Sequence, residues 1–385
     1  MVVPKLRFKA DDGSDFPELE AKSLFDICEY KNKQSVGKNY VGTENMKQNF
    51  SGLESLDEET EMKGVCYCEG DTLMSNIRPY LRKTWKADRE GVCSTDVLVF
   101  HPIDVVSEYL HYLIASDKFI SYVMTGAKGV KMPRGDKEHM MKFSIMVPSL
   151  PEQQKIADFL STIDTIIEKQ RATVSAWEER KKGVMQKLFS QEVRFKADDG
   201  SDFPDWEEKK LGDIGTVKMC KRVLKEQTSE SGDVPFYKIG TFGGIPDAFI
   251  SRELYEELKT KYSFPRKGNI LLSAAGTIGR TVIYDGEDAF FQDSNIVWLD
   301  NDSSVLDKFL LQFYNQTSWD NIEGGTIKRL YNGLFLSKII PLPSLPEQQK
   351  IADCLSALDA VIEKQKETLE KWQELKKGLL QQMFV

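Results

Sequence analysis

Several motifs are missing from this 385-residue sequence, and each absence excludes a class of activity. There is no Pro-Pro pair, so the chain lacks the Asn/Asp-Pro-Pro-aromatic motif with which an amino-methyltransferase holds its target nitrogen. There is no GxxxxGK[ST] phosphate loop, which excludes ATP-driven translocation by this polypeptide. The three histidines and six cysteines are scattered without ligand spacing, so we expect no metal site. Together these absences predict that the chain has no catalytic residues of its own.

Long apolar runs are absent as well. No stretch approaches the roughly eighteen apolar residues of a membrane helix, and the first residues, MVVPKLRFKADDG, lack the apolar core of a signal peptide. Scattered cysteines favour a reducing compartment, so we expect a cytoplasmic protein with no membrane segment. The net charge of −8 argues by itself against a nucleic-acid partner. Local clusters of cations must therefore decide that question.

One stretch of the chain is present twice. Residues 148–190 begin PSLPEQQKIAD and continue to KKGVMQKLF, residues 343–385 begin PSLPEQQKIAD and continue to KKGLLQQMF, and 26 of these 43 positions are identical. Each copy starts with Ser-x-x-Glu beside a proline, which predicts a capping box at a helix start. An apolar 4-3 repeat, which we call the helix seam, then predicts two long helices that pack on each other. The helix-pairing residues expected from it are Ile156, Leu160, Ile163, Ile167, Trp177, Ile351, Leu355, Leu358, Ile362 and Trp372.

The repeat extends beyond these helices. RFKADDGSDFP occurs at residues 7–17 and, letter for letter, at residues 194–204, so the chain is a tandem duplication. Each copy is a globular α/β or α+β segment followed by a long helix. We expect a first globular domain at 1–147, its helix at 148–192, a second globular domain at 193–342 and its helix at 343–385. Between the repeated RFKADDGSDFP and PSLPEQQKIAD sequences, the two globular segments differ strongly in sequence. This difference suggests that they read two different targets.

Clusters of cations on loops of the divergent segments point to DNA as the target. Cations beside glycines and aromatic residues suit phosphate neutralisation and contact with base edges. Any one cluster would also fit a solvated face, but there are five, all in the variable segments and none required by the helix seam. The candidate DNA-binding residues are Arg78, Arg82, Lys131, Arg134, Lys218, Lys221, Arg222, Arg280, Lys328 and Arg329.

Two other classes of protein compete with a DNA reader. Asp205 with Glu207 and Glu208 superficially resembles a nuclease metal site, but these carboxylates crowd into one turn and the first copy has Glu18-Leu19-Glu20 instead. A surface segment is the better interpretation. A coiled-coil scaffold that bridges protein partners without reading DNA would fit the helices alone, and salt-dependent DNA affinity would distinguish the two.

The layout resembles the specificity subunit of a type I restriction-modification enzyme. The resemblance rests on PSLPEQQKIAD, the KKG near each helix end and GDTLMSNIRPYLRK, and it covers essentially the whole chain. It implies that the two helices pair antiparallel and that each globular domain recognises one half of a bipartite site on double-stranded DNA. It also implies that the helices dock two methyltransferase subunits and, through them, restriction subunits. S-adenosylmethionine, ATP and Mg would then belong to those partners, with no cofactor on this chain.

Overall fold

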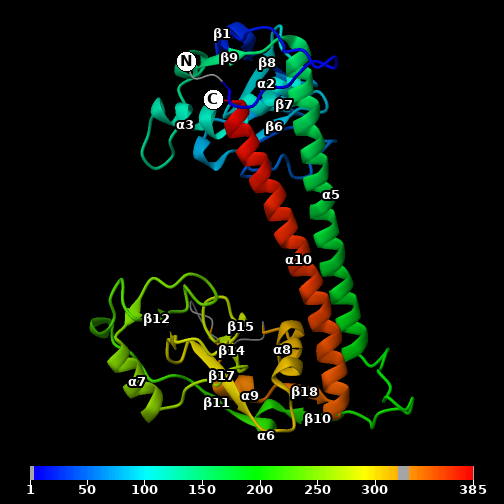
Figure 1. Cartoon of the computed structure of the whole chain (residues 1–385), viewed down its shortest axis with the longest axis vertical. Helices are drawn as coiled ribbons and strands as arrows, with labels where there is room; N and C mark the ends of the chain where they lie inside the picture. The colour runs from blue at the N-terminus through cyan, green and yellow to red at the C-terminus, as the bar shows by residue number, and fades with distance from the viewer. Residues whose placement is uncertain (1–3, 320–328, 385) are drawn as a thin grey trace. The chain divides into compact units, whose positions relative to one another are not determined.

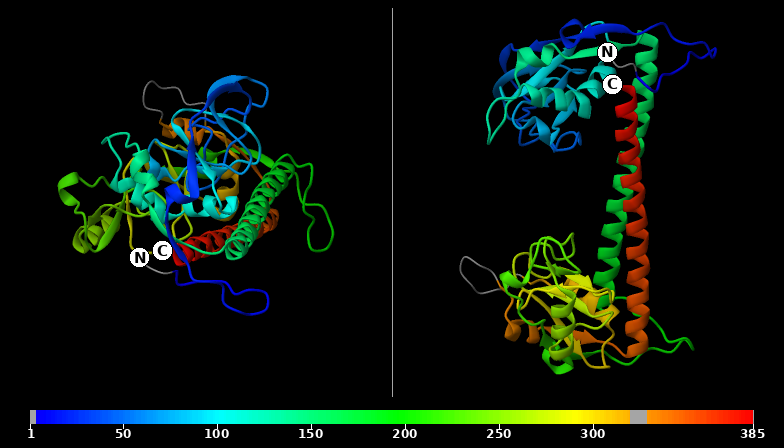
Figure 2. Two further views of the ribbon diagram at one scale, coloured as in Figure 1. Left: turned by 90° about the horizontal axis from the view of Figure 1, so that it is seen from above. Right: turned by 60° about the vertical axis from the view of Figure 1, so that its left-hand side comes forward.

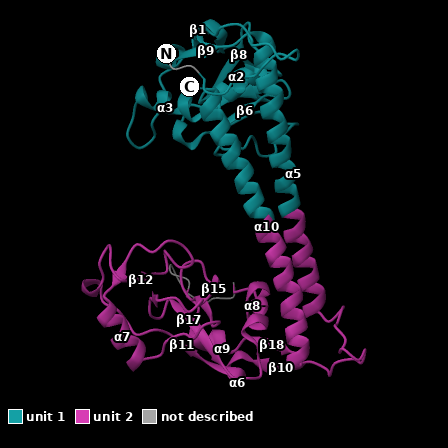
Figure 3. Cartoon of the chain, in the orientation of Figure 1, with its two compact units in different colours: residues 1–174, 365–385 teal, residues 175–364 magenta. Residues whose placement is uncertain are grey.

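The structure is a computed structural model that describes residues 4–319 and 329–384. It divides into two compact units, residues 1–174 with 365–385 and residues 175–364 (Figure 3). Both divisions fall inside long helices, α5 (Leu150–Phe189) and α10 (Leu345–Met383). Each unit therefore contains one globular domain and parts of both helices. None of the helices in the described part of the chain is long and apolar enough to cross a membrane.

The domain of the first unit is built on three antiparallel sheets that short helices cover (Figure 1). The sheet orders are β1-β9, β2-β8-β5-β6 and β3-β4-β7. The strands are β1 (Glu20–Ser23), β2 (Cys28–Lys31), β3 (Gln34–Gly37), β4 (Met62–Tyr67), β5 (Thr72–Ser75), β6 (Thr84–Lys86), β7 (Gly91–Cys93), β8 (Val97–Pro102) and β9 (Ser144–Val147). The helices are α1 (Leu24–Ile27), η1 (Pro79–Leu81), α2 (Ser107–Ile114), α3 (Asp117–Thr125) and α4 (Lys137–Met141).

The second unit repeats this plan with the orders β10-β18, β11-β17-β14-β15 and β13-β12-β16. Its strands are β10 (Glu207–Lys210), β11 (Gly215–Lys218), β12 (Val234–Tyr237), β13 (Phe249–Ile250), β14 (Ile270–Ser273), β15 (Thr281–Ile283), β16 (Phe290–Phe291), β17 (Ile296–Asn301) and β18 (Ile339–Leu342). Its helices are α6 (Leu211–Ile214), η2 (Lys225–Gln227), α7 (Arg252–Lys261), α8 (Asp307–Gln316) and α9 (Asn332–Leu336).

The four-stranded sheets of the two units match strand for strand. In each, the apolar strand that follows a glycine turn, β5 or β14, lies in the middle and is buried along its whole length. It pairs antiparallel with β8 or β17. The smaller sheets differ more, since β12 and β16 pair in parallel whereas β3, β4 and β7 are antiparallel. The structure thus confirms mixed α/β domains on a duplicated scaffold.

The two long helices lie side by side and antiparallel within each unit (Figures 1 and 2). In the first unit Lys376 forms an ion pair with Asp164, and in the second unit Lys181 pairs with Asp359. Lys181 and Lys376 occupy the same position of the two repeats, as do Asp164 and Asp359, so one contact is made twice with the partners exchanged. This is the pattern of a two-fold interface, and it confirms the expected antiparallel coiled coil.

A glutamine pair marks the place where the two helices present the same residue to each other. The Gln170 side-chain amide donates to the Gln365 side-chain oxygen at 2.7 Å and to the Gln365 carbonyl at 2.9 Å. Gln365 is the repeat counterpart of Gln170. A polar residue at a seam position is stabilised only when its partner faces it, so this pair favours one register over its one-turn alternatives.

The apolar seam residues belong to the cores of both units. Ile156, Leu160, Ile163 and Ile167 are buried in the first core, while Ile351 and Leu355 are buried in the second. Leu358 and Trp372 are partly buried against these cores, Ile362 is buried, and Trp177 is half-buried below the Arg180 guanidinium at 5.3 Å. The seam residues therefore have two roles, because they pair the helices and also form part of the core of each globular domain.

The RFKADDGSDFP segment of each unit, which we call the clasp, binds the start of that unit's LPEQQ helix. Arg7 donates to both carboxylate oxygens of Glu152, at 3.1 and 2.6 Å, and this contact raises the pKa of the guanidinium. Arg194 does the same to Glu347, at 3.1 and 2.8 Å. Lys155 and Lys350 each donate back to a backbone carbonyl of the clasp, both at 2.8 Å. The two repeated sequences are thus two halves of one contact.

The predicted capping boxes are not formed. The hydroxyls of Ser149 and Ser344 have no hydrogen-bond partner among the described residues. The glutamates that would complete the boxes are almost fully buried and accept from the clasp arginines instead. A guanidinium offers two parallel N–H donors to a carboxylate, which a single backbone N–H at a helix start does not, so the tertiary contact prevails.

Candidate nucleic-acid interface

Two stretches far apart in sequence, residues 76–83 and 126–135, meet in the first unit. Ile77 pairs with Arg134 as an isolated β-bridge, and the Arg78 N–H donates to the Pro133 carbonyl at 2.8 Å. The contact joins two cation clusters that are separate in the sequence. It gathers four of the predicted DNA-binding residues: Arg78, Arg82, Lys131 and Arg134.

Two of these arginines flank the 3-10 turn η1. Arg78 and Arg82 both have left-handed backbone conformations, with φ of 51° and 55°. Residues other than glycine adopt such angles at a cost, typically where a surrounding structure fixes them and often at functional sites. Arg82 is also held by an ion pair with Asp117 at 2.7 Å, whereas the Arg78 side chain is exposed.

The other two cations stand on a loop with an exposed apolar tip. Arg134 reaches Asp96 at 3.1 Å, yet its side chain remains 56% exposed. Lys131 is exposed, and beside it Val130 is 100% exposed, the highest value among the exposed large apolar residues described. Gly129, with φ of +97°, permits the turn that presents them. Cations and an apolar group at a loop tip can contact phosphates and base surfaces respectively.

In the second unit, Lys218, Lys221 and Arg222 lie at and just beyond the end of strand β11. The Lys221 ammonium stands 4.6 Å from the centre of the Tyr262 ring, while Arg222 is exposed. Tyr262 follows helix α7 directly, so the position of this cluster depends on how α7 is held.

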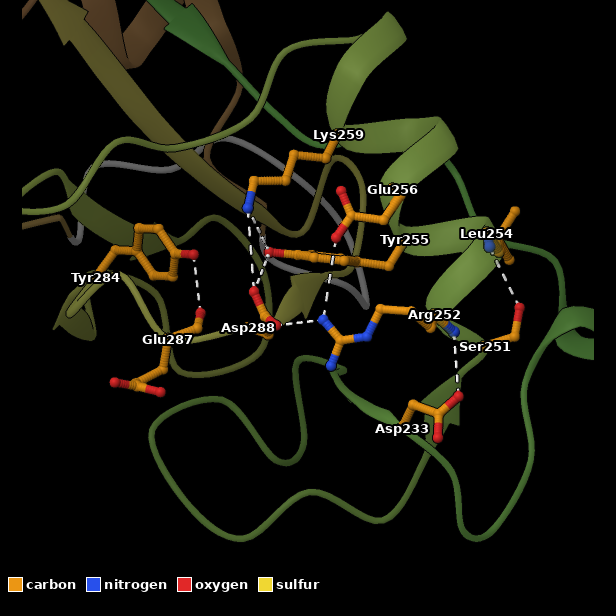
Figure 4. Close-up of polar contacts among 10 residues, drawn as sticks. All are labelled: Asp233, Ser251, Arg252, Leu254, Tyr255, Glu256, Lys259, Tyr284, Glu287 and Asp288. Carbon is orange, nitrogen blue, oxygen red and sulfur yellow. Dashed lines mark hydrogen bonds and ion pairs between the residues drawn. The ribbon is translucent and has the colours of Figure 1, made fainter.

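Helix α7 is anchored by a compact polar network (Figure 4). Asp288 forms an ion pair with Arg252 and accepts from the Tyr255 hydroxyl at 2.9 Å, and the Arg252 contact lowers the pKa of the Asp288 carboxyl. Lys259 donates to the same hydroxyl at 2.8 Å, and Ser251 caps the first turn. These cations have protein partners and hold the helix, and the nearby Lys221 and Arg222 are exposed as well.

Lys218 lines a cavity of about 700 Å³ together with Arg266, Trp298 and Asp300. Arg266 pairs with Asp300 at 2.8 Å and is exposed. Arg266 was not among the predicted contacts, and its counterpart in the first repeat is the uncharged Cys68, because the N–H of each donates to the side chain three residues later. The signal that could have found it is the pair of adjacent cations, Arg266 and Lys267, placed directly before the Gly268 turn.

The corresponding place in the first unit is neutralised. Lys31, the counterpart of Lys218, donates to the fully buried Asp71 at 2.9 Å. Asp71 also contacts His101 at 2.6 Å and accepts from the Cys68 N–H. The second unit has Asn269 where the first has Asp71, and there a carboxylate of the cavity, Asp300, pairs with Arg266. The two domains therefore arrange their charged side chains differently at equivalent positions.

Of the remaining predicted residues, Arg280 directly precedes β15 and Arg329 contacts the segment before β17. The Arg280 guanidinium donates to the Phe242 carbonyl at 2.7 Å, and the Arg329 guanidinium donates to the Ser294 carbonyl at 2.8 Å. Arg329 also forms a β-bridge with Ala275. Lys328 lies outside the described residues. In the part of the chain that the structure describes, no group of three or more His, Cys, Asp or Glu side chains is placed to bind a metal.

Comparison with known proteins identifies the family. The family model described as the type I restriction modification DNA specificity domain matches residues 17–174 and 204–371, once in each repeat and over most of the chain. This chain belongs to that family, so its role is in DNA sequence specificity. Family membership favours this role over the protein-bridging scaffold.

Individual relatives agree with this assignment. A putative type I restriction enzyme specificity subunit from Haemophilus influenzae is 59% identical over 152 residues, which is 39% of this chain and 40% of that protein. A putative type I restriction enzyme specificity subunit from Methanocaldococcus jannaschii is 26% identical over 94% of this chain and 93% of its own length. The crystal structure of the type I S subunit from M. genitalium covers 100% of this chain and 99% of that chain, with a TM-score of 0.56 and 15% identity, and supports the fold.

Proposed function

We propose that this chain is the non-catalytic specificity subunit of a cytoplasmic type I restriction-modification complex. Each globular domain recognises one half of a bipartite site on double-stranded DNA, and the helix pair sets the distance between the half-sites. The observation that carries the proposal is the duplicated scaffold with unlike charged loops, in a chain whose two helix segments are identical at 26 of 43 positions. Equal scaffolds with different surfaces suit two recognition events of the same kind on different sequences.

The cations described above supply the affinity in this proposal. Phosphate contacts release counterions and position a protein on DNA, whereas contacts to base edges select the sequence. Exposed cations such as Lys131 and Arg222 fit the first task, because each can reach a phosphate without first breaking a buried ion pair. A chain with net charge −8 can bind DNA in this way, because its cations are concentrated on a few loops.

The helix pair is the proposed docking surface for two methyltransferase subunits, with restriction subunits bound through them. The support is its repetition: the contact between Lys376 and Asp164 recurs as that between Lys181 and Asp359, so two copies of one partner would meet equivalent surfaces. S-adenosylmethionine, ATP and Mg²⁺ would be bound by those partners. This assignment is consistent with the absence of an amino-methyltransferase motif and of a phosphate-binding loop from the sequence.

The decisive measurement is the methylated motif in cells that carry this chain with its methyltransferase partner. We expect a bipartite motif with an unread spacer. In parallel, the binding of the purified complex to DNA containing that motif is titrated at several salt concentrations. Lys221→Ala with Arg222→Ala should flatten the salt dependence by about one unit of slope for each phosphate that these side chains neutralise in the wild-type complex.

A matched control is available in the same domain. Lys209→Ala with Lys210→Ala removes two adjacent cations from strand β10, outside the predicted contacts. This control should leave the salt slope unchanged. If both pairs gave the wild-type slope, the cation clusters would be solvated surface. If no motif were methylated and binding were insensitive to salt, the specificity proposal itself would fail.

A further inference from the structure

Two of the arginines described above occupy the same place in the two domains. In the first unit Arg134 forms a β-bridge with Ile77, and in the second unit Arg329 forms one with Ala275. Ile77 and Ala275 each stand two residues beyond the end of the central strand, β5 or β14. The backbone after each arginine repeats the match, because the N–H of the next residue donates to the carbonyl just before the bridge partner.

The side chains and the sequence positions of these arginines match as well. Arg134 reaches Asp96 at 3.1 Å, directly before β8, and Arg329 reaches the Ser294 carbonyl at 2.8 Å, just before β17. Each arginine stands fourteen residues before the Pro-Ser-Leu-Pro sequence of its own repeat. A cation is thus retained at one structural position, although the segments around it have diverged.

A second cation accompanies each arginine. Lys83 accepts the Ser75 N–H at its carbonyl at 3.0 Å, and Arg280 accepts the Ser273 N–H at its carbonyl at 2.9 Å, so both sit opposite the last residue of the central strand. Their side chains also act alike. Lys83 donates to the Thr43 carbonyl and Arg280 donates to the Phe242 carbonyl, both at 2.7 Å. We call Lys83 with Arg134, and Arg280 with Arg329, the shared cation pair of each domain.

The loops beside the shared cation pair differ between the domains. In the first unit the neighbours are the loop that carries Val130 and the exposed Arg78. In the second unit the Phe242 carbonyl belongs to a loop whose apolar tip, Ile245, is 88% exposed. Phosphates are the same in every DNA sequence, whereas base edges are not. A constant residue beside variable loops is therefore placed to contact the backbone, and the variable loops are placed to contact bases.

We propose that the shared cation pair is a phosphate-binding site present once in each domain. It would fix the same face of each domain to the DNA backbone and so present the unlike loops to the grooves, an inference that rests on the proposed function. The internal contacts do not use up these side chains. A guanidinium has five N–H donors, and among the residues that the structure describes Arg134 and Arg329 each make one side-chain hydrogen bond or ion pair, which leaves other donors for a phosphate.

The test uses the full chain in complex with its methyltransferase subunits and a DNA that carries the methylated motif. The variants are Arg134→Gln, Arg329→Gln and the double variant, with Arg134→Lys and Arg329→Lys as charge-retaining forms. We expect each Gln variant to lower the salt slope by about one, and the double variant by about two. Specific and non-specific DNA should lose affinity by the same factor. The methylated motif should not change, and the Lys variants should keep the wild-type slope.

Paired cations elsewhere in the two units provide controls. Arg89→Gln removes an arginine that pairs with Glu58 in the first unit, and Lys209→Gln removes a lysine that pairs with Glu207 in the second. Neither should alter the salt slope. Replacing single phosphates by neutral methylphosphonates adds a second measurement. One replacement in each half-site should weaken the wild-type complex but not further weaken the matching Gln variant.

Three results would overturn the inference while leaving the specificity role intact. An unchanged slope in the Gln variants would assign these arginines to fixing their loops only. A motif relaxed at one position would make them base readers. Additive decreases in affinity for every methylphosphonate and Arg→Gln combination would show that no phosphate contacts them. A failure of the specificity role would look different, because the wild-type complex would then show neither a motif nor salt-dependent binding.

Discussion

The clasp at the start of each long helix allows a prediction that compares the two repeats. Arg7→Met and Arg194→Met each leave a buried glutamate, Glu152 or Glu347, without its guanidinium. Removing one partner of a buried ion pair is destabilising by about 3–5 kcal/mol. The two arginine side chains are 30% and 24% exposed, so water can reach the vacated place and the lower end, about 3 kcal/mol, is the appropriate figure for Arg7→Met.

The second repeat has a compensation that the first lacks. The Trp206 indole N–H donates to Glu347 at 3.0 Å, whereas the first repeat has Leu19 at the matching position, which has no side-chain donor. A hydrogen bond to a charged group is worth about 1.5–3 kcal/mol. Arg194→Met should therefore be milder than Arg7→Met, by about 1.5 kcal/mol.

Hydrogen exchange measures this difference where it arises. A chain of two units need not unfold in one step, so a global denaturation curve would mix the two effects. Amide exchange in residues 150–160 and 345–355 reports the opening of each helix start separately. Leu19→Trp in the Arg7→Met background should restore part of the protection, and Trp206→Leu should remove the advantage of Arg194→Met. Equal decreases in protection in the two single variants, unaffected by these second changes, would refute the reasoning.

Three further predictions concern recognition, spacing and acidity. Replacing residues 18–147 by the matching segment of a related chain should change one half of the methylated motif and leave the other half intact; a change in both halves would contradict independent readers. Inserting one heptad at matching levels of both helices keeps every seam residue facing its partner and lengthens the pair by about 10 Å, so the motif should keep both half-sites and gain a spacer of one to about three base pairs. An active variant with an unchanged spacer would show that something else sets the distance. Burial, with Lys376 and Lys86 nearby, lowers the pKa of His111 to about 3 from 6.5. Because the unfolded chain then binds more protons than the folded chain between these pH values, the free energy of unfolding of the first unit should decrease by about 2 kcal/mol as the pH falls from 6.5 to 5. Amide exchange in the first unit as a function of pH tests this, and His111→Gln should remove most of that loss.

The helices could be predicted from sequence because their structure depends on a repeating local pattern. The seam residues from Ile156 onward recur at 4-3 spacing, and the duplicated sequence allows each position to be checked against its copy. The central strands, which follow Gly70 and Gly268, also carry local signals, namely a turn and a short apolar run. Antiparallel packing is not a local property, and it came from the resemblance to a family.

Local sequence patterns of this kind could not predict the contacts between segments that lie far apart in the chain. The Glu152 carboxylate was assigned to a capping box because Ser149 is its neighbour in sequence, whereas its partner, Arg7, stands far earlier in the chain. The match between Arg134 and Arg329 was missed for the same reason, although both were named as candidate contacts. Their equal distance from the following Pro-Ser-Leu-Pro sequence was a usable signal, but only the β-bridges after β5 and β14 give it a structural meaning.

The first unit combines residues 1–174 with residues 365–385 from the other end of the sequence, and this has a consequence for synthesis on the ribosome. Leu380, Met383 and Phe384 are buried in the core of the first domain, and the Phe384 ring lies 5.3 Å from that of Tyr109. The domain that emerges first is thus completed by side chains translated after the whole of the second domain. During elongation its apolar surface stays open, and a premature stop after the second domain would damage the first. Quality control of the nascent chain therefore acts on the first domain for longest.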